Sequence, residues 1–202
     1  MRPFTLTVNA GFATFMALST FAHAQNRELT ADEVRNYFAQ VQREATELVQ
    51  TGDAEAISQW SERHIADDAH FKVSVQALRE SQPKMWSVID LDKADINRLQ
   101  ILLGQTVIRS IQDYSLRIDV DKVVPHGADA ATVTTIWSDR FKVTPPAPTA
   151  PGQAQNTVGQ AQAGAQPRTL DVKRTLECDH LLVRDQGQLK IGLSDCRGQA
   201  QF

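Results

Sequence analysis

The spacing of apolar residues changes from helical to alternating near Ile111, and this change constrains the fold more than any other feature of the chain. Before it, residues 34–49 place apolar side chains three and four positions apart, which is the spacing of one helical face. After it, residues 114–121, 133–143 and 170–182 alternate apolar and polar side chains, as half-buried strands do. The sequence therefore predicts an α+β domain, with helices first and an antiparallel meander of strands after them.

Local signals mark the ends of the expected helices. Thr30 and Glu33 form a capping-box pattern at the start of the first helix, and Gly52 suits a left-handed cap at its end. Asp53 begins a second, shorter helix, which we expect to end near Asp67 and Asp68. These two aspartates are interpreted as turn formers rather than catalysts.

The remaining segments before Ile111 give weaker patterns. A short strand is expected at residues 71–75, and a third helix is expected to start near Asp92 or Asp95. Residues 76–91 are interrupted by Pro83 and favour no single assignment. Tight turns are expected at residues 126–129 and 185–188, which lie between alternating runs.

The first 24 residues predict a cleavable signal peptide. Arg2 gives a positive start, residues 4–21 carry no charge, and Ala22-His23-Ala24 fits a small-x-small cleavage site. Asn9 and Gly11 interrupt the apolar run, which argues against a permanent membrane span. The expected product is a single domain of residues 25–202, periplasmic or secreted. Its mildly acidic composition, with a formal net charge of −3 for the full chain, gives no footprint for nucleic acid or for anionic membranes.

Both cysteines, Cys178 and Cys196, lie in this domain, and export favours a disulfide between them. Two buried free thiols are the alternative. If Arg184 lies opposite Leu189 in the last hairpin, Cys178 falls opposite Asp195, one residue from Cys196. A bulge or a different turn is then needed to bring the two sulfur atoms together.

Residues 145–167 contain no charged and no aromatic residue. Such a segment buries too little apolar surface to offset the entropy of ordering it, so we interpret it as a disordered insert between two paired strands. It is either a neutral insertion or a tether that binds a partner.

Four short motifs resemble nuclear-transport-factor-2-like proteins. They are residues 51–57, 65–71, 127–135 and 186–191, which occur in the order of that family and span most of the domain. The resemblance implies a cone-like fold, in which a curved antiparallel sheet wraps around a long helix and encloses a pocket. The family includes ketosteroid isomerases, scytalone dehydratases, polyketide cyclases, transport factors and many non-enzymatic domains, so the fold does not give the function.

Charged and polar residues interrupt the inward faces of the expected strands. If the strands before and after the insert pair directly, Asp139 and Arg174 lie opposite each other, and a buried ion pair results. Alternatively, Asp139, Arg174 and His180 form an acid–base or anion-binding set at the mouth of a pocket, with Trp137 beside them. The isomerases of the family use an aspartate base with a tyrosine donor. Asp139 and Tyr114 are the nearest such types here, but neither maps onto the isomerase motif.

A metal site is a weaker reading of the second helix and its continuation. His64 and His70 lie near Asp67 and Asp68, and all four are common metal ligands, yet a solvated helix end explains them better. No phosphate-binding loop, nucleophile elbow or zinc-protease motif occurs in the sequence, so we expect neither a metal nor another cofactor.

The sequence favours an exported domain that binds a small, largely apolar ligand or pairs with a second copy through the outer face of its sheet. Thr132, Thr134 and Ile136 lie on that outward face. The alternative is a cofactor-independent lyase or isomerase that uses Asp139, His180 or Tyr114.

Overall fold

The computed structural model describes residues 27–78, 85–106, 108–144 and 169–202. The expected signal peptide and the expected insert at 145–167 lie outside these residues. Two helices come first, α1 (Ala31–Thr51) and α2 (Ala54–His64), followed by strands β1 (Ile65–Leu78) and β2 (Met85–Asp92). Helix α3 (Lys93–Thr106) and a short 3-10 turn lead into β3 (Ile111–Pro125), β4 (Ala130–Val143), β5 (Leu170–Asp185) and β6 (Gln188–Gln201).

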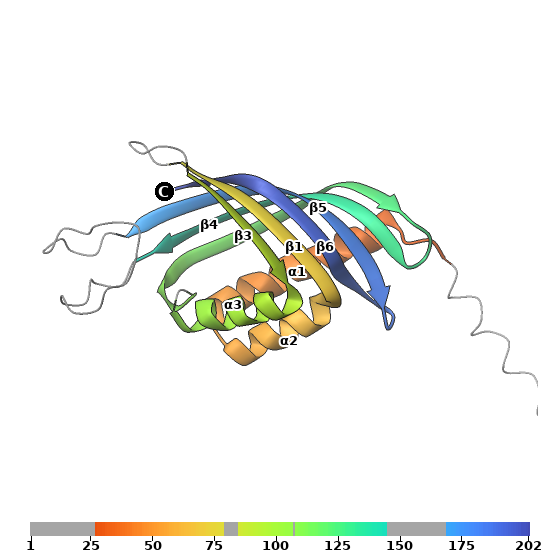
Figure 1. Ribbon diagram of the computed structural model, residues 1–202, viewed down its shortest axis with the longest axis horizontal. Helices are drawn as coiled ribbons and strands as arrows, with labels where there is room; N and C mark the ends of the chain where they lie inside the picture. The colour runs from red at the N-terminus through yellow and green to blue at the C-terminus, as the bar shows by residue number, and fades with distance from the viewer. Residues whose placement is uncertain (1–26, 79–84, 107, 145–168) are drawn as a thin grey trace, which may run out of the picture.

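The strands form one curved sheet in the order β2-β1-β6-β5-β4-β3. The three α-helices lie against one face of this sheet, as Figure 1 shows. The prediction of an α+β domain with helices packed in a curved sheet is confirmed. The prediction of a wholly antiparallel sheet is wrong, because β1 pairs in parallel with β6 while every other neighbouring pair is antiparallel.

Helix α1 begins and ends as its sequence predicts. Thr30 and Glu33 form a reciprocal capping box, and Gly52 adopts the left-handed conformation with φ of 63°. One face of the helix packs into the concave side of the sheet, where Val34, Phe38 and Val41 are almost wholly buried. They meet Val133, Leu182 and Ile191 from β4, β5 and β6 in the main apolar core.

Helix α2 ends at His64, earlier than the sequence predicts, and Asp67 and Asp68 are strand residues rather than turn formers. The Tyr37 hydroxyl donates to the carbonyl oxygen of His64 at 3.1 Å, which satisfies one of the last free carbonyls of the helix. The chain then enters β1 directly, because Ile65 and Ala66 gain a buried position beside Ile96 of α3. The expected strand at 71–75 is the middle of this longer strand.

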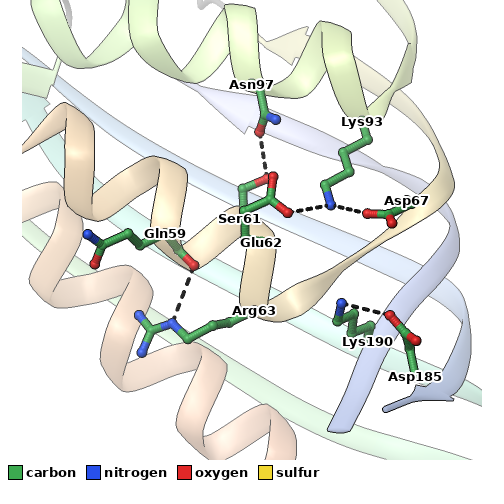
Figure 2. Close-up of polar contacts among 9 residues, drawn as sticks. All are labelled: Gln59, Ser61, Glu62, Arg63, Asp67, Lys93, Asn97, Asp185 and Lys190. Atoms are coloured by element: carbon green, nitrogen blue, oxygen red, sulfur yellow. Dashed lines mark hydrogen bonds and ion pairs between the residues drawn. The ribbon is translucent and has the colours of Figure 1, made fainter.

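Asp67 instead joins an ion-pair cluster around Lys93. The Lys93 ammonium donates to Glu62 at 2.9 Å and to Asp67 at 2.6 Å, so one side chain connects α2, β1 and the start of α3. Ser61 of α2 donates to Asn97 of α3 at 2.6 Å beside it. Figure 2 shows both contacts between the two helices. This polar cluster connects α3 to α2.

The predicted disulfide between Cys178 and Cys196 is present. Arg184 does lie opposite Leu189, and the pairing of β5 with β6 then shifts by one residue between Leu181 and Leu182. This irregularity places Cys178 opposite Cys196, so the bulge that the sequence required is confirmed. The disulfide lies on the concave face with Leu176, Val73 and Trp137.

Candidate functional site

A pocket opens where the first half of α1, the end of α2 and the β5–β6 hairpin meet. We call it the hairpin pocket, and its volume is about 390 Å³. Its lining is mixed, with apolar surface from Tyr37 and Leu189 and polar groups from both helices and the hairpin. The lining residues are Glu33, Asn36, Tyr37, Gln40, Arg63, His64, Arg184, Gly187, Gln188 and Leu189.

His64 is the most buried polar residue of this lining, with 3% of its surface exposed. Its Nε2 lies 2.8 Å from Oε2 of Glu44, and because a carboxylate only accepts hydrogen bonds, Nε2 carries the hydrogen. Tyr37 and Trp60 pack their rings against the imidazole at centroid distances of 5.6 and 5.0 Å. The ring is therefore held in one orientation. The expectation that His64 is part of a solvated helix end is wrong.

Glu44 connects α1 to the end of α2. Burial alone would raise the pKa of its carboxyl group, but hydrogen bonds from Gln40 and His64 and the charge of Arg63 outweigh burial and lower it. Glu44 is consequently a carboxylate at neutral pH. The same burial raises the pKa of the Tyr37 hydroxyl well above its ordinary value, so Tyr37 stays protonated and remains a donor.

Asp139 and Arg174 lie opposite each other on β4 and β5, as predicted from the sequence. Arg174 donates through Nε at 3.1 Å and also through Nη2 to Oδ2 of Asp139. The Asp139 side chain is 5% exposed, and its other oxygen, Oδ1, has no hydrogen-bond partner in the described part of the chain. Tyr114 lies nearby: burial, with a smaller contribution from the Asp139 charge, raises its pKa to about 12.

His180 belongs to a second polar group on the same concave face. Its Nε2 lies 2.9 Å from Oγ1 of Thr135, which also accepts a hydrogen bond from Nε1 of Trp137 at 2.8 Å. The ring is 2% exposed and lies 5.3 Å from that of Phe38. Burial lowers the pKa of His180 to about 4, so the imidazole is neutral at physiological pH.

The structure therefore divides the predicted site residues into two groups. His180 lies opposite Val133, whereas Asp139 follows six positions later on β4. At the rise of an extended strand this separation is roughly 20 Å. Asp139, Arg174 and Tyr114 occupy one part of the concave face, and His180 and Trp137 occupy another.

The residues that the sequence offers as metal ligands lie apart and bind other partners. Asp67 binds Lys93, His64 binds Glu44, and His70 pairs with Asp90 on β2. No group of three or more His, Cys, Asp or Glu side chains gathers in the residues that the structure describes. Among those same residues, no helix has the length and apolar character needed to cross a membrane.

Sequence reasoning missed the hairpin pocket. Its residues come from positions 33–64 and 184–189, and their meeting depends on how α1 crosses the sheet. One local signal was present: Trp60 and His64 are four residues apart on α2, and so lie on one helical face. Their partner Glu44 lies on α1, and no sequence spacing indicated that pairing.

Comparison with models of protein families found no match, and comparison with curated protein sequences found none. Solved structures do align with most of the chain. A nuclear transport factor 2-like superfamily protein from Salmonella enterica is 9% identical, with a TM-score of 0.48, over 84% of this chain and 94% of that one. A ketosteroid isomerase-like protein from Erwinia carotovora atroseptica is 11% identical, with a TM-score of 0.43, over 84% and 98%.

A third structure, a nuclear-transport-factor-2-like protein of unknown function from Shewanella oneidensis, is 9% identical with a TM-score of 0.43, over 81% of this chain and 98% of that one. The fold itself follows from the strand order and from the packing of α1 into the concave face. The chain has an α+β fold in which three helices pack against one curved, mixed sheet.

Proposed function

We propose that this chain is an exported small-ligand-binding domain, and that its ligand site is the hairpin pocket. The observation that carries the proposal is a pocket of about 390 Å³, which is within the usual range for small-molecule sites. Its lining combines apolar surface with polar groups, so a ligand can be both desolvated and oriented there.

The frame of the pocket supports binding without rearrangement. His64 is fixed by Glu44 and by two aromatic rings, and the start of α1 is fixed by its capping box. A preformed site spends little of its binding free energy on ordering side chains. The lining is more polar than the sequence led us to expect, so the ligand of this pocket has polar groups besides an apolar part.

Export is part of the proposal and rests on two features. The sequence begins with a signal-peptide pattern, and the domain carries a disulfide between Cys178 and Cys196. Such a bond persists in oxidising compartments and is rare in reducing ones.

A pocket-filling variant tests the site. The protein, purified from a host that expresses the full sequence, is screened by NMR against phenol, benzamide, benzoate and hexanoate. Binders should shift the amide resonances of Tyr37, His64 and Leu189. Asn36→Trp places a large side chain in the lining and should abolish those shifts. Ala39→Trp is the matched control, because Ala39 is also exposed on α1 but does not line the pocket. Shifts that persist in Asn36→Trp would show that the ligand site lies elsewhere.

A second candidate function is a cofactor-independent isomerase or lyase acting at Asp139 and Tyr114. The observation that favours it is the unpartnered Oδ1 of a buried Asp139 beside a protonated Tyr114. A carboxylate of this kind can take a proton from carbon while a phenol stabilises the enolate. The test is exchange of the α-protons of cyclic ketones with D₂O. Exchange that Asp139→Asn abolishes would favour this function over simple binding.

A further inference from the structure

The charged groups of the hairpin pocket are unequal in number. Two guanidinium groups, Arg63 and Arg184, line it, and Glu33 is the single carboxylate in the described lining. Glu44, the partner of His64, is not part of the lining, although it also lies 3.3 Å from Nη2 of Arg63 and offsets part of that charge. Among the lining residues themselves, arginine side chains outnumber carboxylates by one.

Arg184 is held by backbone carbonyls rather than by an acid. Its Nε donates to the carbonyl of Ala128 at 3.2 Å, and its Nη1 donates to that of Gly187 at 3.3 Å. Oε1 of Glu33 is 3.7 Å from Nη2, beyond hydrogen-bond distance. The other oxygen of Glu33 accepts from both the backbone and the hydroxyl of Thr30 in the capping box. Arg184 is thus oriented without being neutralised by a hydrogen-bonded carboxylate.

Arg63 also keeps free donors. Its Nε donates to the carbonyl of Gln59 at 3.4 Å, and its Nη2 lies 3.3 Å from Oε2 of Glu44. That oxygen already accepts from His64 at 2.8 Å. A guanidinium group has five N–H donors, so most of those of Arg63 remain for another acceptor.

Three other arginines of the chain are paired differently. Arg140 donates through two nitrogens to Asp171, and Arg117 and Arg174 each donate through two nitrogens to Asp119 and Asp139. Each of these three directs two nitrogens at one carboxylate, and Arg140 makes the parallel, two-pronged contact with both oxygens of Asp171. The two arginines of the hairpin pocket lack such a contact.

We infer that the ligand of the hairpin pocket is a small carboxylic acid, bound as its anion by Arg63 and Arg184, with an apolar body against Tyr37 and Leu189. The inference rests on the proposed function, since it names the ligand class of the same site. A carboxylate fits better than a phosphate ester, because the lining has an excess of one positive charge and a phosphate dianion would remain partly unneutralised.

Probes of equal shape but different charge test whether the pocket prefers an anionic ligand. Benzoate, phenylacetate and hexanoate are each compared with the corresponding amide, and phenyl phosphate is added as the dianion. Binding is followed through the Tyr37, His64 and Leu189 amide resonances and the Nε–H resonances of Arg63 and Arg184. We expect at least one acid to bind at least tenfold more tightly than its amide, and more tightly than phenyl phosphate.

Two variants locate the anion contact. Arg63→Gln should weaken binding of that acid about tenfold and weaken binding of its amide by a smaller factor, because a neutral carbonyl makes the weaker hydrogen bond with a guanidinium group. The Arg63 side chain is 54% exposed, so the change should not disturb folding. Arg184→Gln should act in the same direction. Arg117→Gln is the control, because Arg117 is exposed on β3 and does not line the pocket.

The outcomes separate the two proposals. Equal binding of acids and amides at the pocket would overturn the carboxylate inference and leave the binding function intact. Tighter binding of phenyl phosphate would likewise overturn it. If no probe shifts any resonance of the pocket, both the inference and the proposed function fail.

Discussion

Gly198 lets β5 and β6 approach closely at the bend of the sheet. A Cβ at this position would collide with the carbonyl oxygen of Thr175 and would lie 2.8 Å from Cα of Leu176. Both obstacles are backbone atoms, which cannot rotate away. The residue is therefore required by space and not by a left-handed conformation.

Gly198→Ala should destabilise the domain by about 2 kcal/mol, the cost of forcing an extra group into a packed region. Chemical denaturation of the oxidised protein measures this. Gly192→Ala is the matched control on the same strand, because its Cβ would meet the Val183 side chain at an ordinary 3.5 Å. Equal effects of the two substitutions would contradict the steric explanation.

His180 makes stability depend on pH in a defined window. Burial lowers its folded pKa to about 4, whereas the unfolded chain binds a proton near the ordinary value of about 6.5. The unfolded state is thus favoured progressively as pH falls from 6.5 towards 4. Above pH 6.5 the imidazole is neutral in both states, so His180 causes no further change in stability there. We expect the free energy of unfolding to fall by about 2 kcal/mol between pH 7 and pH 5.

The variant His180→Gln isolates this effect. It loses packing at every pH, but its unfolding free energy should vary less between pH 7 and pH 5 than that of the unmodified protein. Denaturant titrations at four pH values provide the comparison. An unchanged slope in the variant would mean that another group causes the pH dependence.

At the level of elements, Lys93 connects α2, β1 and α3 through one ammonium group. The Lys93 side chain is 10% exposed, while Glu62 and Asp67 are 60% and 86% exposed. Burial lowers the pKa of Lys93, but the two carboxylates outweigh it and raise the pKa overall. Removing the charge leaves both acids in contact with water, whereas reversing it places a third acid in a poorly hydrated position.

Lys93→Met should therefore cost only about 1 kcal/mol, because its apolar stem is kept and the acids stay hydrated. Lys93→Glu should cost about 3 kcal/mol or more, since its carboxylate would be buried without a cation. Thermal unfolding of the two variants gives the contrast. A Lys93→Met variant as unstable as Lys93→Glu would show that the ion pairs themselves hold α3.

Elements with strong local signals were predictable from the sequence. Thr30 with Glu33 and Gly52 set the ends of α1, and the alternation around Asp139 and Arg174 set their cross-strand pairing. The position of β1 was not predictable, because acids at 67 and 68 interrupt the alternation and the burial of Ile65 depends on α3.

The candidate site likewise has one part that the sequence predicts and one part that it does not. The ion pair of Asp139 and Arg174 follows from strand alternation, which is local. The contact of His64 with Glu44, and the presence of Arg63 and Arg184 in one pocket lining, bring together separate elements. Their geometry depends on the crossing of α1 over the sheet, which no single-sequence pattern specifies.

For the whole molecule, we propose that a second copy binds to the convex face of the sheet. Ile136 and Leu193 are 39% and 48% exposed on it, and a hollow beside Leu193 is lined by Leu181 and Thr132. Charged pairs such as Arg140 with Asp171 lie on the same face. Apolar groups surrounded by polar ones are typical of protein interfaces, and this pattern supports the homodimer expected from the sequence. The homodimer stays a prediction.

Sedimentation velocity tests this prediction. We expect a dimer at micromolar concentration. Leu193→Lys should raise the dissociation constant of this dimer at least tenfold. Ala39→Lys is the control, because Ala39 is exposed on α1, which lies against the other face of the sheet. A protein that sediments as a monomer at every concentration would exclude this use of the convex face.

The parallel pairing of β1 with β6 has a consequence for synthesis. Residues 70–78 are made well before their parallel neighbours, residues 193–201, which follow four intervening strands. During synthesis, one side of β1 therefore stays open until β6 has emerged. Because the disulfide joins β5 to β6, oxidation, too, waits until Cys196 has been made.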